Sequence, residues 1–438
     1  MKPHLLHLCL AAAGLVHGLA MAQAPQAPQA ASAAGKDIVI DSAPAEAAAP
    51  AVVPPPLPPG RGPAAAALAE LGLDLLRQPG SEPAVAVNVA VSPVSLAAGL
   101  GLVHAGSGPL GARELAGLMG SRTSGERLFA SHLPRLLAAL QQPGSGVSLA
   151  NRVWVARSAG RAVPAAYAER VQQRYQADAE LLNFADAEAA RRSINRWAAD
   201  KTAQRIPTLL PPGSVTPASR MVLTSALHFK SPWHKPFDPA RTAAKPFHTA
   251  PGALKLVPTM SDEREVRMGQ VGPLTVMELP FAAAGYAVLL AMPQQGRDLQ
   301  AALDDIDGSD LATWGDRLQP LTCRLEMPKL QLAPRPQALK PALQALGVEA
   351  VFGAGADFSP LLGRAAKGVY LDNVYQSVAV TLDEQGGEAA AATAAVGLAK
   401  SFSRPPVCAV NRPFVFAIVH KPSGAPLFVG RIVDPSLP

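Results

Sequence analysis

The sequence is poor in the residues and motifs on which most enzymatic chemistry depends. Its 438 residues contain 3 cysteines and 5% aromatic residues, and charged residues make up only 16%. It lacks a G-x-S-x-G nucleophile turn, a G-x-x-x-x-G-K-[ST] phosphate loop and an H-E-x-x-H metal motif. The histidines are scattered, and beyond the first 24 residues none pairs with another at i, i+4. We therefore expect no cofactor and no metal site, while a Ser-His-Asp arrangement formed only in space stays open.

The charge pattern gives little support for nucleic-acid binding. The net charge is +6 and the pI is about 9.3, but no run of the chain is rich in Lys and Arg. Nucleic-acid-binding proteins concentrate such residues in a patch or stripe. We expect neither a nucleic acid nor a membrane as a partner, because no run after the first 24 residues is long and apolar enough to form a membrane-spanning helix.

The first 24 residues have the composition of a secretory signal peptide. Met1-Lys2 precedes a short apolar run, Leu5 to Val16, and two small-x-small cleavage signals end at Ala22 and Ala24. Cys9 lies too early to be a lipid-attachment cysteine. The mature protein is therefore predicted to be exported, either secreted or periplasmic, and soluble.

Cys323 and Cys408 are the cysteines that follow this segment. Two cysteines in an oxidising compartment can form one disulfide. Each lies in an apolar, strand-like stretch, and this setting favours two separate buried thiols over a bridge.

Domain boundaries follow from composition. Residues 25–63 are mostly alanine and proline, which bury too little apolar surface to offset the entropy of ordering, so they predict a disordered linker. No second linker and no internal repeat follows. Residues 64–438 are therefore expected to form one large domain.

The domain combines early helices with later strands. Helical spacing marks 64–76, segments of 95–119, 167–175, 187–201 and 338–346; alternating or continuous apolar runs mark strands at 84–93, 147–157, 220–230, 274–281, 286–293, 376–385, 412–421 and 426–435. This order predicts an α+β fold with a mostly antiparallel sheet.

Six blocks, in order and at matching spacing, resemble the serpin family across residues 64–438. They are NVAVSPVSLAAGL (88–100), ELLNFADAEAARRSINRW (180–197), ALHFKSPWHKPFDPARTAAKPFH (226–248), VPTMS (257–261), MELPF (277–281) and NRPFVFAIVHKPSGAPLFVGRIVDP (411–435). The resemblance implies three β-sheets with a large central, mostly antiparallel one, about nine helices and an exposed reactive-centre loop. It also implies a suicide-substrate inhibitor rather than an enzyme: a serine protease cuts the loop, becomes an acyl-enzyme and is trapped when the loop inserts into the main sheet of a metastable fold.

The hinge of that loop resembles the pattern of inhibitory serpins, E-E-G-[TS]-E-A-A-A-A-T. The matching hinge residues are Glu384, Gly386, Gly387, Glu388, Ala389, Ala390, Ala391, Ala392 and Thr393. Every second residue from Gly387 to Gly397 is small and uncharged, as a strand that must enter a core requires. Gly387 departs from the usual Thr or Ser. Composition alone would favour a surface helix or flexible linker here; the flanking strands and the resemblance favour an insertable loop.

A polar region where the sheet opens is also implied by the resemblance. Its residues here are Asn88, Ser92, Ser95, Ser225, Trp233 and Gln376. Ser225 and Gln376 stand where the family has Asn and His, and both replacements are polar. We expect Gln376 to hydrogen-bond Ser225 or its backbone.

The reactive bond follows by counting. Inhibitory serpins have seventeen residues from the hinge glutamate through the residue before the cut, which gives Lys400-Ser401 here, with Arg404 as the alternative in a shifted register. Either basic residue predicts a trypsin-like serine protease as the covalent partner of a monomeric inhibitor. Two other functions stay open, a non-inhibitory serpin that binds or carries a ligand and, with no motif in its favour, a secreted hydrolase.

Overall fold

The computed structural model describes residues 63–78, 87–160, 162–250, 252–363, 368–387 and 405–437. The predicted signal peptide and nearly all of the predicted linker lie outside these ranges. Of the predicted loop residues, Glu388 to Thr393, Lys400, Ser401 and Arg404 also lie outside them.

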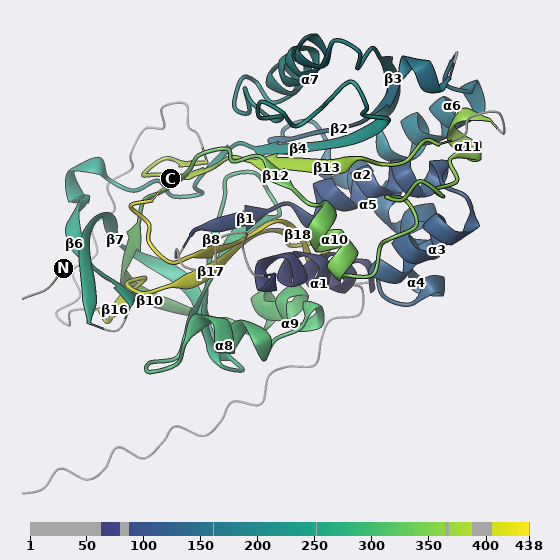
Figure 1. Cartoon of the computed structure of the whole chain (residues 1–438). Helices are drawn as coiled ribbons and strands as arrows, with labels where there is room; N and C mark the ends of the chain where they lie inside the picture. Colours follow the sequence, from purple (N-terminus) through teal and green to yellow (C-terminus); the bar gives the residue numbers. More distant parts are fainter. Residues whose placement is uncertain are drawn as a thin grey trace, which may run out of the picture. The chain divides into compact units, whose positions relative to one another are not determined.

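Most helices come early in the described chain (Figure 1). They are α1 (Pro63–Arg77), α2 (Pro93–Gly106), α3 (Pro109–Leu118), α4 (Arg122–Arg127), α5 (Leu133–Leu140), α6 (Ala165–Tyr175) and α7 (Ala187–Lys201), followed later by α8 (Leu299–Asp304), α9 (Gly308–Thr313), α10 (Lys340–Ala345) and α11 (Ser359–Leu362). A π-helical turn, Leu128–His132, joins α4 to α5. Side chains cap the N-termini of two of these helices: those of Ser92 and Asp186 accept hydrogen bonds from backbone N–H groups at the starts of α2 and α7.

A five-stranded mixed sheet forms the first of the two large sheets. Its order is β12 (Gln337–Ala338), β13 (Asn373–Val378), β4 (Met221–Phe229), β2 (Val147–Ala156) and β3 (Asp178–Leu182). The pairs β13–β4 and β2–β3 are parallel, and the other two pairs are antiparallel. In Figure 1, α7 covers one side of this sheet and α2 lies on the other.

The central strand β4 is buried on both faces. Met221, Leu223, Leu227 and Phe229 join the main hydrophobic core together with α2, while Val222 and Ala226 join smaller clusters with α7 residues. Odd-numbered residues of β4 therefore face the main core, and even-numbered residues face α7.

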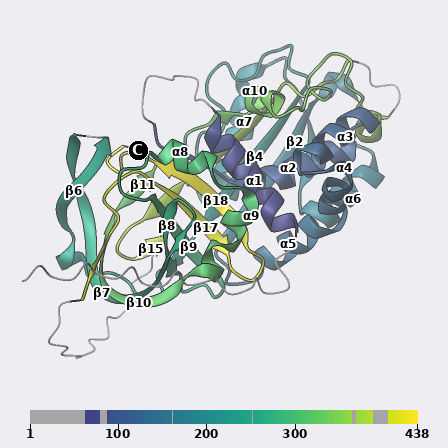
Figure 2. The same cartoon turned by 90° about the horizontal axis from the view of Figure 1, so that it is seen from below.

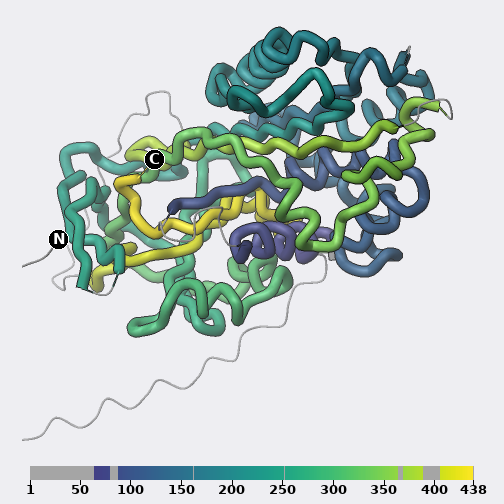
Figure 3. The backbone as a smooth tube through the Cα atoms, in the orientation of Figure 1, coloured from purple at the N-terminus to yellow at the C-terminus, as the bar shows by residue number. Residues whose placement is uncertain are grey.

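The second large sheet has nine strands. Its order is β1 (Val89–Val91), β18 (Ala425–Ile432), β17 (Phe414–His420), β9 (Tyr286–Pro293), β8 (Leu274–Pro280), β7 (Ala253–Val271), β10 (Gln319–Pro328) and β16 (Val407–Ala409), with β6 (Ala243–Ala250) paired to β7. All pairs are antiparallel except β10–β16. Figure 3 shows β1 and β18, from opposite ends of the chain, side by side.

Two small two-stranded sheets follow the C-terminal ends of β4 and β13. β11 (Leu330–Leu332) pairs with β14 (Val380–Leu382), and β5 (Ser231–Pro232) pairs with β15 (Gly386–Gly387). Figure 2, which views the molecule from below, labels β15 near β8 and β9.

The α+β class is confirmed. The helices predicted at 64–76, 167–175 and 187–201 and the strands predicted at 147–157, 220–230 and 286–293 all form, within two residues of their predicted ends. The sequence analysis missed the β6–β7 hairpin, because polar residues interrupt its apolar pattern, and it anticipated β10 only as a strand-like stretch around Cys323. Within the described ranges, no helix combines the length and apolar character needed to cross a bilayer.

The preference for two separate thiols was wrong. Cys323 on β10 and Cys408 on β16 form a disulfide, with their Cα atoms 6.0 Å apart. Each cysteine lies in an apolar strand, as expected, but these two strands are neighbours in one sheet. That pairing is not visible in the local sequence.

Candidate functional site

A buried cluster of neutral polar side chains bridges β2, β4, β13 and the start of α2. We call Ser92, Ser95, Asn151, Ser225 and Gln376 the buried cluster; none of the five is more than 4% exposed. Ser225 pairs in register with Gln376 on one side and with Asn151 on the other, so three adjacent strands contribute one row of polar groups.

Gln376 is the centre of this hydrogen-bond network. Its Oε1 accepts from the N–H of Ser92 at 2.9 Å, and its Nε2 donates to the carbonyl of Ser92 at 3.0 Å. Nε2 also lies 3.4 Å from Oγ of Ser225, so the predicted Gln376–Ser225 hydrogen bond is present, as a long one. Oγ of Ser225 makes a shorter bond, 2.7 Å, with Oγ of Ser95. The cluster thus joins β4 and β13 to the N-terminus of α2 without burying a charge.

A second cluster surrounds the turn that follows β14. We call Trp233, Thr242, Lys329, Asp383 and Glu384 the hinge cluster. Oε2 of Glu384 lies 2.8 Å from Nζ of Lys329, and its Oε1 accepts from Oγ1 of Thr242 at 2.8 Å. The indole N–H of Trp233 donates to the carbonyl of Asp383 at 2.7 Å, and its ring stacks on Phe281 at 4.8 Å.

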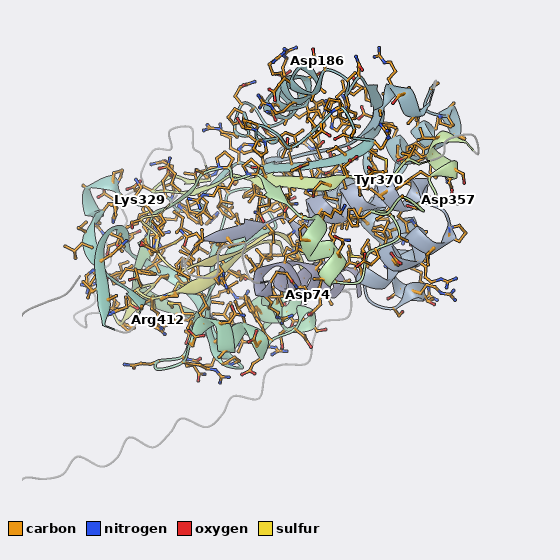
Figure 4. All side chains as sticks on the ribbon, in the orientation of Figure 1. Asp74, Asp186, Lys329, Asp357, Tyr370 and Arg412 are labelled. Atoms are coloured by element: carbon orange, nitrogen blue, oxygen red, sulfur yellow. A yellow bond between two sulfur atoms is a disulfide. The ribbon has the colours of Figure 1, made fainter. Side chains whose placement is uncertain are left out.

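Main-chain hydrogen bonds hold the same turn against the segment after β5. The N–H of Trp233 donates to the carbonyl of Gln385 at 2.8 Å, and the N–H of Phe237 donates to the carbonyl of Glu384 at 2.7 Å. Lys329, labelled in Figure 4, also donates its N–H to the carbonyl of Pro258 on β7. The hinge is therefore tied to strands of the nine-stranded sheet.

Electrostatics stabilise the ionised form of Glu384. Burial alone would raise the pKa of this carboxyl, but hydrogen bonds from Lys329 and Thr242 outweigh burial and leave the pKa below its usual value. The side chain of Glu384 is 12% exposed and that of Lys329 is 39% exposed, so the pair lies at the edge of the core.

The two glycines of the hinge differ in what they require. Gly386 has φ +120°, and a Cβ there would lie 2.4 Å from the backbone nitrogen of Trp233. Gly387 has no such φ, and a Cβ would meet its nearest neighbour at an ordinary 3.4 Å. The close approach of the hinge to Trp233 therefore depends on glycine at 386 only.

Asn88 does not join either cluster. Its Nδ2 donates to the carbonyls of Asp434 and Leu437 at 2.8 and 3.0 Å, and its Oδ1 accepts from the N–H groups of Val433 and Asp434. It thus fixes the C-terminal segment. The predicted sheet-opening residues divide among three places: Ser92, Ser95, Ser225 and Gln376 in the buried cluster, Trp233 in the hinge cluster, and Asn88 at the C-terminus.

The sequence analysis did not single out Asn151, Thr242, Lys329 or Asp383. Asn151 had a signal, since it is a polar residue in the middle of an apolar strand. Thr242 lies in the block 226–248 that resembles the family, whereas Lys329 had no signal. Neither contact with Glu384 is visible locally, because the residues are 142 and 55 positions apart.

The described residues contain no group of three or more His, Cys, Asp or Glu side chains arranged to hold a metal ion. The chemistry of both clusters is hydrogen bonding between strands. The site can hold two strands together or release them.

Comparisons with known proteins show the class of protein to which this fold belongs. The sequence model of the serpin family (serine protease inhibitor) matches residues 66–435, and the chain belongs to this family. Serpin B8 of Bos taurus is 32% identical over 371 residues, which cover 83% of this chain and 97% of that protein. The family assignment made from the six sequence blocks is confirmed.

Solved structures show the same fold. The structure of native protease nexin-1 with heparin is 26% identical, covers 85% of this chain and 100% of its own, and has a TM-score of 0.73. Thyroxine-binding globulin in complex with thyroxine has a TM-score of 0.74 at 23% identity, covering 85% and 99% of the two chains, and so shows the fold alone. The fold therefore serves protease inhibitors and also a protein that binds a hormone.

Proposed function

We propose that this protein inhibits trypsin-like serine proteases as a suicide substrate, by inserting its cut reactive loop between β4 and β13. One observation carries the proposal. Gly386 and Gly387 pair antiparallel with Pro232 and Ser231, directly beyond the end of β4. Gly386 and Gly387 thus have the direction of a strand that would run back along β4.

The register of this pair supports insertion in detail. Continued without a bulge, it would place Ala389, Ala391, Thr393, Ala395 and Gly397 opposite Phe229, Leu227, Ser225, Leu223 and Met221. Paired residues of antiparallel strands share a face, and these β4 residues face the main core. The small, uncharged set would therefore enter the core, and Glu388 would lie opposite the exposed Lys230.

The same register would bring Thr393 beside Ser225 in the buried cluster. An inserting strand must separate Gln376 from Ser225, because β13 and β4 are directly paired there. The Thr393 hydroxyl would then offer Ser225 a new hydrogen-bond partner in place of Gln376. Neutral side chains allow this exchange at a lower cost than an ion pair would.

The trap would work through the acyl-enzyme. The protease serine would attack the carbonyl of Lys400, the amine of Ser401 would leave, and Lys400 would stay esterified to the protease. Strand insertion would then carry Lys400 and the bound protease away from Ser401 before water can hydrolyse the ester. Lys400 suits a protease whose primary pocket carries a carboxylate, and Arg404 is the alternative reactive residue.

Mixing the protein with trypsin tests the proposal. We expect an SDS-resistant complex with the combined mass of the protease and of the inhibitor's N-terminal fragment, and we expect Lys400→Ala to reduce its formation rate about 100-fold. If Lys400→Ala still inhibits trypsin and Arg404→Ala does not, the reactive bond is the one that follows Arg404. Cleaved protein without complex would indicate a non-inhibitory, carrier-type serpin, and turnover of an ester substrate by the protein alone would indicate a hydrolase.

A second experiment tests insertion separately from cleavage. Thr393→Asp would place a charge in the core, so the variant should be cut by trypsin at the normal rate but form little complex. Glu388→Gln is the matched control, because this side chain would stay at the surface and complex formation should be unchanged. Equal complex yields from both variants would contradict insertion in this register.

We also propose that the protein acts as a monomer in an oxidising compartment, secreted or periplasmic. Residues 1–24 would direct export, and residues 25–63 would tether the domain formed by residues 64–438. The Cys323–Cys408 disulfide supports this location, since stable disulfides are rare in reducing compartments.

A further inference from the structure

The disulfide fastens the strand that follows the reactive loop. Within the described ranges, β16 is three residues long, lies at the edge of its sheet and pairs with β10 alone. Cys323 and Cys408 are 0% and 4% exposed, so the bond is buried. Main-chain hydrogen bonds also hold this segment: the N–H groups of Arg324 and Val410 donate to the carbonyls of Pro406 and Glu326, both at 2.8 Å, and the N–H of His248 donates to the carbonyl of Asn411 at 2.9 Å.

Both ends of the reactive loop lie near one end of the β4–β13 contact. The loop leaves Gly387 at the hinge and reaches β16 at Val407. β16 pairs with Arg324 to Glu326, and three residues later Lys329 binds Glu384 in the hinge. An uncut loop that entered the sheet would therefore have to turn and come back to β16.

The chain is too short for that return while the disulfide is intact. Insertion through Gly397 uses about ten residues, which span roughly 34 Å along β4. From Gly397 back to Cys408 the fully extended chain covers roughly 37 Å. The remaining few Å must supply both the turn and the crossing to the other sheet, which is not enough. Without the disulfide, hydrogen bonds such as those of Val410 and Asn411 still hold the segment before Phe414 on β17. If these bonds open, the extra six residues add about 20 Å.

We propose that the Cys323–Cys408 disulfide is a latch that keeps the uncut loop out of the sheet, so that only a cut loop inserts. The proposal rests on the proposed inhibitory function. Once the Lys400–Ser401 bond is cut, the inserting part no longer has to return to β16, and the latch does not hinder it. The latch therefore opposes spontaneous inactivation without slowing the trap.

The experiment compares the wild type with Cys323→Ala/Cys408→Ala during incubation below the unfolding temperature. We expect the double variant to lose trypsin inhibition at least about tenfold faster while its mass stays that of the uncut chain, and to gain heat stability as it does so. Equal rates of loss in the two proteins would overturn the latch.

Two controls separate the latch from general stability and from the proposed function. Leu325→Ala removes buried side-chain volume beside Cys408 but keeps the disulfide, so it should inactivate at the wild-type rate; inactivation as fast as the double variant would contradict the proposal. Cutting the loop with trypsin should raise heat stability equally in the wild type and the double variant. If cleavage raises the heat stability of neither protein, loop insertion is refuted, and with it the proposed function. If cleavage stabilises both proteins but the uncut proteins inactivate at equal rates, the latch alone is refuted.

If the double variant does not fold, folded wild-type protein can be treated with dithiothreitol. Two electrons and two protons from the dithiol convert the S–S bond to two thiols, and the dithiol leaves as a cyclic disulfide. The reduced protein, verified by thiol counting, should inactivate uncut about tenfold faster than the oxidised protein, and equal rates would again refute the latch.

Discussion

The buried cluster holds β13 against β4 and the start of α2, and the hinge cluster holds the turn after β14 against the segment after β5. The two clusters do so with opposite chemistry. In the buried cluster, Gln376 and three serines, all 0% exposed, make only neutral hydrogen bonds. In the hinge cluster, Glu384 and Lys329 form an ion pair whose lysine is 39% exposed. Neutral bonds lie where an entering strand would have to replace them in the core, and the charges lie where they can remain close to water. Under the proposed function, the hydrogen bonds in the core half of the contact would be exchanged and those in the hinge half would be released.

The largest effect should follow from breaking the buried cluster. Gln376→Ala leaves the N–H of Ser92 buried without a partner and removes one of two hydrogen bonds to its carbonyl, which still accepts from the N–H of Leu96. The free energy of unfolding should therefore fall by about 3 kcal/mol. Urea unfolding measures the change. Gln337→Ala is the matched control: Gln337 lies opposite Gln376 in register but makes one bond, to the carbonyl of Ala90. Equal decreases in the free energy of unfolding of the two variants would show that Gln376 stabilises the fold no more than Gln337, with its single side-chain hydrogen bond, does.

The two adjacent glycines of the hinge provide a sharper contrast. Gly386→Ala should lower the free energy of unfolding by about 2 kcal/mol, because φ is positive there and Cβ would collide with the Trp233 backbone. Gly387→Ala should raise it by about 0.5 kcal/mol, because the folded chain has room and the unfolded chain loses freedom. Thermal unfolding of the pair should give shifts of opposite sign; shifts of the same sign would contradict the described turn.

A smaller effect is expected from one hydrogen bond of the hinge. Trp233→Phe preserves an aromatic ring against Phe281 but removes the N–H that binds the Asp383 carbonyl, so it should cost about 1 kcal/mol. Because this bond holds the turn, the variant's loop should also insert faster, which stopped-flow fluorescence of a labelled loop can follow. A cost as large as that of Trp233→Ala would mean that the ring is displaced.

The smallest effect should depend on pH. The pKa of Glu384 is lowered in the folded protein, so its contribution to stability is present above the ordinary value of 4.5 and is lost as the pH falls through the lower, folded-state pKa. Glu384→Gln should therefore be slightly less stable than the wild type at pH 7, and the difference should shrink below pH 4.5. Urea midpoints between neutral pH and the acid range test this. Gln376→Ala supplies the contrast. Because Gln376 and its partners are neutral, the difference in stability between this variant and the wild type should not shrink as the pH is lowered over the same range.

Local patterns in the sequence predicted much of the fold, but not the contacts between distant segments. The strand at 220–230 and the helix at 187–201 follow from apolar spacing, and they form as β4 and α7. The Gln376–Ser225 bond was predicted because the family resemblance supplied the pairing of two strands. The contacts of Lys329 and Thr242 with Glu384, and the closeness of Cys323 to Cys408, could not be predicted, since they depend on the register between strands far apart in the chain.

Asn88 has a consequence for how the protein is made. It is among the first described residues of the chain, yet its four hydrogen bonds reach only residues 433–437, the last described ones. Those partners are synthesised 345 to 349 residues after Asn88, so β1 cannot complete its contacts until that distant stretch has been translated. A nascent chain that has not yet reached residue 433 leaves the amide of Asn88 without these partners, so this part of the domain has to fold after a long delay.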